Sequence, residues 1–175
     1  VTFADDRLVQ VMNDMKNFGI RGQEEVAYIG GNAKMNEFQA AMGICNLRHV
    51  DEEIAKRKNV VEHYRKRLGD GKGIVLCNEQ ENVKSNYSYF PVYFEGYKLT
   101  RDEVFTLLKE NDIISRKYFY PLTNCMECYK DFPTAGGEKT PVAKRISEGI
   151  LTLPLYADLD LNDVDKICDL ILQDK

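Results

Sequence analysis

The sequence lacks the features that mark several large classes of protein. Its 24 lysines and arginines are outnumbered by 28 aspartates and glutamates, and the net charge is −4. This balance gives no electrostatic basis for binding nucleic acid or an anionic membrane. There is also no run of about 18 apolar residues of the kind that spans a bilayer, and we expect no signal peptide.

Cysteine and histidine are scarce as well. Five cysteines, an odd number, argue against a disulfide framework and favour a reducing compartment, so we expect a cytoplasmic protein. Cys125 and Cys128 form a CxxC pair, but a zinc site needs further ligands. The two histidines, His49 and His63, would lie about 20 Å apart on one helix, so they cannot bind one ion together. We predict no metal site, and a redox role for the CxxC pair is barely better supported.

What remains is an ordinary globular composition, with 43% hydrophobic and 30% charged residues. A length of 175 residues suits one domain or one and a fraction, and it can bury a core without disulfides or metals. Residues 1–4, which include no initiator methionine, read as the end of a strand running into a helix. We therefore expect a piece of a longer protein.

The first third of the chain predicts two helices joined by a loop. Apolar residues at helical spacing indicate a helix over about 5–18, and residues 20–31 are glycine-rich and polar. Asn36 and Gln39 form a capping box for a long helix that runs to about Leu68, roughly 50 Å in length. Gly43 inside that helix costs about 1 kcal/mol relative to alanine, so we expect it to pack closely against another helix.

The glycines of residues 69–73 end the long helix and open a smaller α+β unit. We expect strands near residues 87–94, 113–120 and 150–155. We expect helices after a capping box of Thr100 and Glu103, at Thr140-Pro141, and after an Asn162 cap. The alternation predicts an α/β chain that ends in a small sheet covered by helices on one face.

Two segments carry groups that suit a ligand. In residues 115–121 the cations Arg116 and Lys117 are followed by Tyr118, Phe119 and Tyr120. Cations and phenols beside an apolar wall suit a phosphorylated or sugar ligand, and plain packing explains the pattern equally well.

The second segment contains Asn32 and Lys34, which follow two glycines and open the predicted long helix. An amide and a cation at a helix N-terminus can hold a phosphate. On local evidence alone, a simple helix cap is the favoured interpretation.

A family resemblance changes this balance. Residues 31–43, GNAKMNEFQAAMG, resemble the G-x-N-x-(R/K)-M-x-E-x-Q-A-A-x-G signature of the DegT-type aminotransferases. The similarity returns at residues 115–122 and 151–156, and residues 16–19 resemble the segment just after the family's cofactor lysine. These are fold-type-I enzymes that use pyridoxal 5'-phosphate (PLP) to aminate keto-sugar nucleotides. The resemblance covers nearly the whole chain.

The resemblance implies a domain plan and a reaction. Residues 1–35 would be a remnant of the large PLP-binding domain, 36–69 a connecting helix, and 70–175 the small domain. Glutamate would donate its amino group through PLP to a nucleotide sugar, within a homodimer. The Schiff-base lysine is expected upstream of Val1, because no lysine here matches its motif. The 175-residue chain alone is therefore predicted to be inactive.

The resemblance also assigns residues. Asn32 matches the asparagine that reaches the partner subunit's site and hydrogen-bonds the cofactor phosphate, and Lys34 stands where many members have arginine. The sugar-pocket stretch contains Arg116, Tyr118, Phe119 and Tyr120, in a form similar to enzymes that aminate the 4-position of dTDP-linked 6-deoxyhexoses.

Two alternatives stay open. One is a lysine-less PLP sugar dehydratase of the same fold, and the other is a non-catalytic interaction module. If a larger domain is missing, the apolar faces of the first helix and of the start of the long helix should be exposed.

Overall fold

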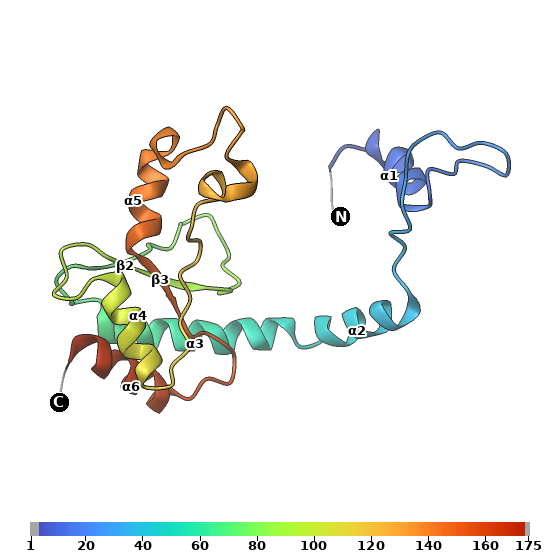
Figure 1. Cartoon of the computed structure of the whole chain (residues 1–175). Coiled ribbons are helices and arrows are strands. Elements are labelled where there is room, and N and C mark those ends of the chain that lie inside the picture. Colours follow the sequence, from blue (N-terminus) through green and yellow to red (C-terminus); the bar gives the residue numbers. More distant parts are fainter. Residues whose placement is uncertain (1–3, 174–175) are drawn as a thin grey trace. The chain divides into compact units, whose positions relative to one another are not determined.

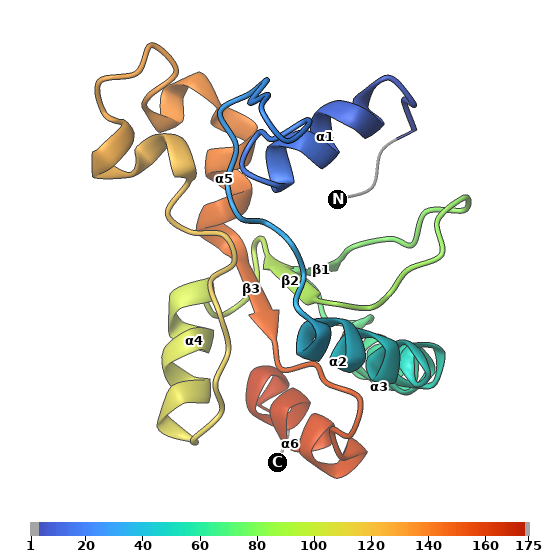
Figure 2. The ribbon, with the colours of Figure 1, turned by 90° about the vertical axis from the view of Figure 1, so that its right-hand side faces the viewer.

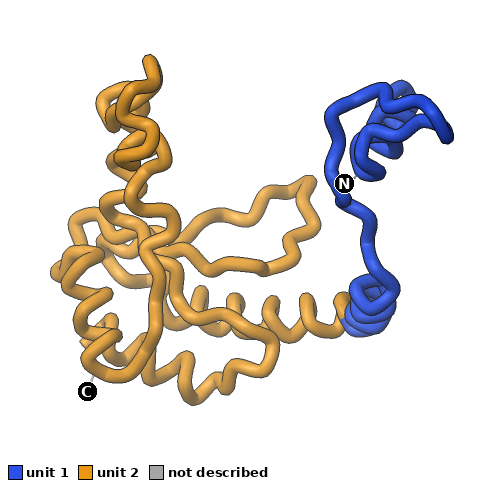
Figure 3. Tube along the Cα trace, turned by 45° about the vertical axis from the view of Figure 1, so that its right-hand side comes forward, with its two compact units in different colours: residues 1–49 blue, residues 50–175 orange. Residues whose placement is uncertain are grey.

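The computed structural model describes residues 4–173, so the strand end expected at residues 1–3 lies outside the described part. The described chain contains six α-helices, three 3-10 turns and three strands. It divides into two compact units, Val1–His49 and Val50–Lys175, which are coloured separately in Figure 3.

The first unit begins with a short helix held against a loop. Helix α1 spans Leu8–Lys16, within the predicted range of 5–18. The backbone N–H of Gly31 donates to the carbonyl of Met15 at 2.9 Å, which returns the loop to the end of the helix. A Cβ on Gly30 would lie 2.5 Å from the same carbonyl oxygen, so only glycine allows this approach.

Helix α2 spans Glu37–Leu47 and begins with the predicted capping box. The Gln39 N–H donates to Asn36 Oδ1 at 2.9 Å, and the Asn36 N–H donates to Gln39 Oε1 at 3.0 Å. All of α2 lies in the described part, and none of its residues is buried. Phe38 is 88% exposed, which confirms the expected exposure of this apolar face. The predicted close packing at Gly43 is wrong for the described chain, since a Cβ there would meet nothing within 4 Å.

The prediction of one continuous helix from Asn36 to Leu68 is also wrong. Arg48 and His49 form a turn, and helix α3 spans Val50–Leu68. Two poor helix formers, Gly43 and Asn46, precede the interruption. The predicted division into residues 1–35, 36–69 and 70–175 stays a prediction. In the structure, α3 packs within the second unit.

The second unit is built on a three-stranded antiparallel sheet in the order β1-β2-β3 (Figure 2). The strands are β1 (Ile74–Leu76), β2 (Phe90–Phe94) and β3 (Ile150–Leu153). Val92 on β2 lies opposite Leu151 on β3. The side chains of β2 alternate between buried and half-buried, as expected for a sheet with one covered face.

Helices form the other layer of this unit (Figure 1). The layer contains α3, α4 (Arg101–Glu110) and α6 (Leu161–Leu172), whereas α5 (Pro141–Gly149) stands apart from these helices and leads into β3. The predicted Thr100–Glu103 capping box is present at α4. In the core, the ring of Tyr64 on α3 stacks on Phe90 with centroids 4.8 Å apart. The Tyr64 hydroxyl donates to the carbonyl of Pro154 at 3.1 Å, which joins α3 to the segment after β3.

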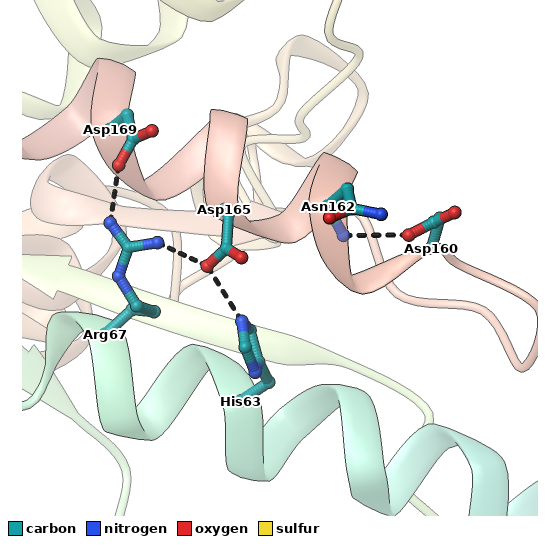
Figure 4. A network of polar contacts seen from close by, with 6 residues as sticks. All are labelled: His63, Arg67, Asp160, Asn162, Asp165 and Asp169. Atoms are coloured by element: carbon teal, nitrogen blue, oxygen red, sulfur yellow. Dashed lines mark hydrogen bonds and ion pairs between the residues drawn. The ribbon is translucent and has the colours of Figure 1, made fainter.

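Polar contacts also join α3 to α6 (Figure 4). His63 Nε2 lies 2.8 Å from Asp165 Oδ1, and Arg67 pairs with both Asp165 and Asp169. The His63 contact, followed by Arg67, holds the pKa of the Asp165 carboxyl below its usual value. Arg67, in the last turn of α3, therefore links this helix to α6.

Two further predictions are corrected by the structure, and one strand was missed. The last helix is capped by Asp160, whose carboxylate accepts from the Asn162 N–H at 2.8 Å, and not by Asn162. The three-residue strand β1 was not predicted. Residues 113–120 are not a strand, because the chain turns after Lys117 and the Tyr120 N–H donates to the Lys117 carbonyl at 2.7 Å.

Candidate functional site

The segment from Arg116 to Tyr120 is fixed at one end by the sheet. The Arg116 N–H donates to the Thr152 carbonyl at 3.0 Å, and the Thr152 N–H donates back at 2.8 Å. This isolated antiparallel bridge sets Arg116 beside strand β3. The chain then leaves the sheet; Lys117 and Tyr118 are half-buried, and Phe119 and Tyr120 are exposed.

Four residues of unit 2 form an aromatic cluster: Tyr89, Arg116, Tyr118 and Phe119. The Arg116 guanidinium donates to the Tyr118 hydroxyl, and its carbon lies 5.3 Å from the Tyr118 ring centroid. The Tyr118 and Phe119 rings stack at 4.7 Å with an interplanar angle of 9°. Tyr89 meets both rings edge-on, at 5.8 Å and 6.4 Å. Phe119 is 69% exposed, so the cluster offers a ring surface and a cation to solvent.

Tyr89 is a member of the cluster that its sequence position did not reveal. Its place in a run of alternating aromatics predicted a strand position, where such residues usually pack across strands. The strand begins only at Phe90, so Tyr89 lies outside the ladder and its ring is 55% exposed.

A groove of about 1350 Å³ opens beside the cluster within the second unit. Its wall includes Tyr89, Arg116 and Tyr118 together with the chain after β3 and one side of α6. Ligand pockets for small molecules measure roughly 300–1,000 Å³. The groove therefore has space for a ligand larger than a single sugar, with a cation and phenols at one side.

The structure separates Tyr120 from the other three predicted substrate residues. Its ring faces the guanidinium of Arg101, whose carbon is 4.9 Å from the ring centroid. Tyr120 does not line the groove described above. Phe119 is also absent from the lining of the groove, but its ring stacks on Tyr118, which does line it. Tyr120 is 50% exposed and packs on Arg101 instead of joining the cluster.

Asn32 and Lys34 belong to the first unit and precede helix α2, because its cap is Asn36. The sequence had placed them at the helix start. Asn32 pairs with Asn17 in an isolated bridge. The Lys34 ammonium donates to the Asn17 side-chain carbonyl at 2.7 Å and lies 4.6 Å from the Phe18 ring centroid. Both side chains are exposed, and they stand two residues apart.

The CxxC cysteines lie on two successive 3-10 turns, η1 (Thr123–Cys125) and η2 (Glu127–Tyr129). Both thiols are free and exposed. Among residues 4–173, no group of three or more His, Cys, Asp or Glu side chains could hold a metal ion. Within the same range, every helix is too short or too polar to cross a bilayer.

The fold matches the C-terminal domain of solved aminotransferase structures. The chain matches the structure of DesI, solved in the presence of its TDP-sugar product, with a TM-score of 0.84 and 27% identity, covering 97% of this chain and 43% of DesI. It also matches the PLP form of the putative sugar aminotransferase Spr1654 from Streptococcus pneumoniae, with a TM-score of 0.85 and 21% identity, covering 98% of this chain and 44% of that one.

The chain belongs to the DegT/DnrJ/EryC1/StrS aminotransferase family, which it matches over residues 1–172. It is 41% identical over 159 residues to a dTDP-4-amino-4,6-dideoxy-D-glucose transaminase from Escherichia coli. That match covers 90% of this chain and 43% of the relative. The chain therefore spans less than half the length of this curated relative.

PLP is the cofactor of this family, and part of the chain fits one end of it. The Asn32 amide and the Lys34 ammonium are exposed hydrogen-bond donors two residues apart, and a phosphate accepts from both kinds of group. Lysine supplies the charge without the bidentate fork that arginine would offer. These two residues suit the phosphate end of the cofactor.

Proposed function

We propose that this chain is the C-terminal part of a longer PLP-dependent aminotransferase. The reaction transfers the amino group of glutamate to a ketone at the 4-position of a dTDP-linked 6-deoxyhexose. The observation that carries this proposal is the 41% identity, across nine-tenths of the chain, to a dTDP-4-amino-4,6-dideoxy-D-glucose transaminase. The Schiff-base lysine then lies in the part of the protein that precedes Val1.

The division of roles follows from the chemistry of the described residues. Bound PLP supplies the electron sink for amino transfer. Asn32 and Lys34 hold its phosphate, with Asn32 reaching the site of the partner subunit in a homodimer. Arg116 pairs with the diphosphate of the nucleotide sugar, because a guanidinium forms strong charge-assisted hydrogen bonds with phosphate. Tyr118 and Phe119 provide the apolar wall of the sugar pocket.

The five free cysteines support a reducing, cytoplasmic setting. On this proposal the 175 residues alone neither bind PLP tightly nor transfer an amino group. Titration of the isolated chain with PLP tests this. A tight 1:1 complex with Schiff-base absorbance that depends on a lysine within these residues would overturn it.

The substrate assignment is tested in the full-length enzyme with Phe119→Ala. We expect the KM for the keto-sugar nucleotide to rise about tenfold, which corresponds to about 1.4 kcal/mol, the size of one aromatic contact. The amino-donor half-reaction should not change. Phe132→Ala is the matched control, since Phe132 is also an exposed phenylalanine, 59% exposed, and packs against Tyr129. Equal KM values for the two variants would refute the role of Phe119.

The cofactor assignment is tested separately with Asn32→Ala in the full-length dimer. We expect weaker PLP binding, measured by the loss of cofactor on dialysis. Asn13→Ala, at an exposed position of α1, serves as control. If Asn32→Ala retains PLP as well as the control does, Asn32 does not hold the phosphate.

A further inference from the structure

Arg101, the first residue of helix α4, is a buried cation that no step above uses. Its side chain is only 3% exposed. Arginine is seldom buried without specific partners, because an unpaired charge in the interior is costly. Its contacts therefore show what the residue holds in place.

Those contacts converge on the substrate segment. Arg101 Nη1 donates to the carbonyls of Ser147 at 3.1 Å and Ile150 at 3.3 Å, at the junction of α5 and β3. The face of the same guanidinium meets the Tyr120 ring at 4.9 Å. One side chain thus ties the start of α4 to the start of β3 and to the end of the segment that contains Tyr118 and Phe119.

Asp102 completes the arrangement beside this cation. Its Oδ1 lies 2.8 Å from Arg101 Nε, an ion pair whose N–H is not aligned for a hydrogen bond. The same oxygen pairs with the ammonium of Lys117, which also lies 4.5 Å from the Phe105 ring centroid. Lys117 immediately follows Arg116, so Asp102 holds the middle of the same segment.

The segment is consequently fixed at three places. Arg116 pairs with Thr152 of β3, Lys117 is held by Asp102, and Tyr120 packs on Arg101. Tyr118 and Phe119 lie between these points. With both flanks held, the Tyr118 ring stays in the groove wall and the Phe119 ring stays stacked on it, without a rigid strand around them.

We propose that Arg101 is a positioning residue for nucleotide-sugar binding: through Tyr120 it holds Tyr118 and Phe119 at the edge of the groove, without touching the sugar itself. The inference rests on the proposed function for its substrate and on these contacts for its geometry. Lysine cannot replace Arg101, because a single ammonium cannot serve all of its contacts. Nη1 of the guanidinium reaches both carbonyls, Nε faces Asp102, and the planar group lies over the Tyr120 ring.

The matched variants are Arg101→Met, Arg101→Lys and the control Arg67→Met, made in the full-length enzyme. Arg67 is a partly buried arginine elsewhere in the unit, where it links α3 to α6. We expect Arg101→Met to raise the KM for the keto-sugar nucleotide about tenfold. The amino-donor half-reaction should stay within about twofold of wild type, as expected when only nucleotide-sugar binding is weakened. Arg101→Lys should resemble Arg101→Met, and Arg67→Met should lower the thermal midpoint without changing KM.

Trypsin cleavage after Lys117 provides a readout that does not depend on the substrate. Under native conditions, cleavage of the Lys117–Tyr118 bond should be at least about fivefold faster in Arg101→Met than in Arg67→Met, since release of Tyr120 frees the segment. Equal cleavage rates and equal KM values would overturn the positioning role. Faster cleavage in an enzyme whose wild type aminates no keto sugar would support the positioning contacts and reject the proposed function.

Discussion

Tyr64 links α3 to the groove wall, and the contribution of this link to the free energy of unfolding can be predicted. Its side chain is fully buried, its ring stacks on Phe90, and its hydroxyl donates to Pro154, which lines the groove. Tyr64→Phe removes one neutral hydrogen bond and keeps the ring, so it should cost about 1 kcal/mol of unfolding free energy. Tyr64→Ala also empties the volume of the ring, and the cost should be about 3–5 kcal/mol.

The assay is urea unfolding of the same protein at neutral pH, with midpoints compared at a common slope. Tyr93→Phe is the matched control. The Tyr93 hydroxyl is 3.4 Å from Glu95 at the surface, and its removal should change stability by less than about 0.5 kcal/mol. If Tyr64→Phe equals this control and Tyr64→Ala loses less than about 2 kcal/mol, well below the range for emptied core sites, the packing described for α3 is wrong.

Three further outcomes follow from buried or paired groups. Ser115 has a buried hydroxyl with no hydrogen-bond partner among the described residues. Ser115→Ala should therefore leave the unfolding midpoint unchanged or raise it. Ser147→Ala removes a hydrogen bond to the Lys144 carbonyl, so it should lower the midpoint. Burial raises the pKa of the Cys168 thiol to about 12. A thiol reagent at pH 8 should therefore modify the four exposed cysteines quickly and Cys168 only on unfolding. Rapid modification of all five cysteines would contradict this. The lowered pKa of Asp165 stabilises the fold above the carboxyl's unfolded pKa, near 4, and this stabilisation is lost as pH falls through the folded pKa. The free energy of unfolding should therefore fall less steeply with decreasing pH in Asp165→Asn than in the wild type. An unchanged dependence on pH would reject the contribution of this carboxyl.

Local sequence rules predicted the features that depend on a few neighbouring residues. The capping boxes at Asn36 and Thr100 were predicted from spacing and are present, because each is satisfied within one turn. The strand β1 was missed since three residues carry too little pattern. The break between α2 and α3 was missed because apolar periodicity continues across it, although Gly43 and Asn46 weaken the helix there.

The candidate site was predictable only in part. The resemblance selected Arg116, Tyr118 and Phe119, and the structure brings them together in one cluster. It did not find Tyr89, whose role depends on where β2 begins, or Arg101, which in the sequence is one more charge in the first turn of a helix. The burial of Arg101 arises from α5 and β3, about fifty residues further along, and no local pattern reports it.

Amino transfer by the full-length protein remains the decisive experiment. PLP-loaded enzyme is mixed with glutamate and a dTDP-4-keto-6-deoxyhexose, and the nucleotide sugar is analysed by mass spectrometry and NMR. We predict a product in which an amine replaces the C4 ketone, with one 2-oxoglutarate formed per amine. A loaded enzyme that returns the keto sugar unchanged, or a product that has lost a hydroxyl and gained no nitrogen, would contradict the proposed function.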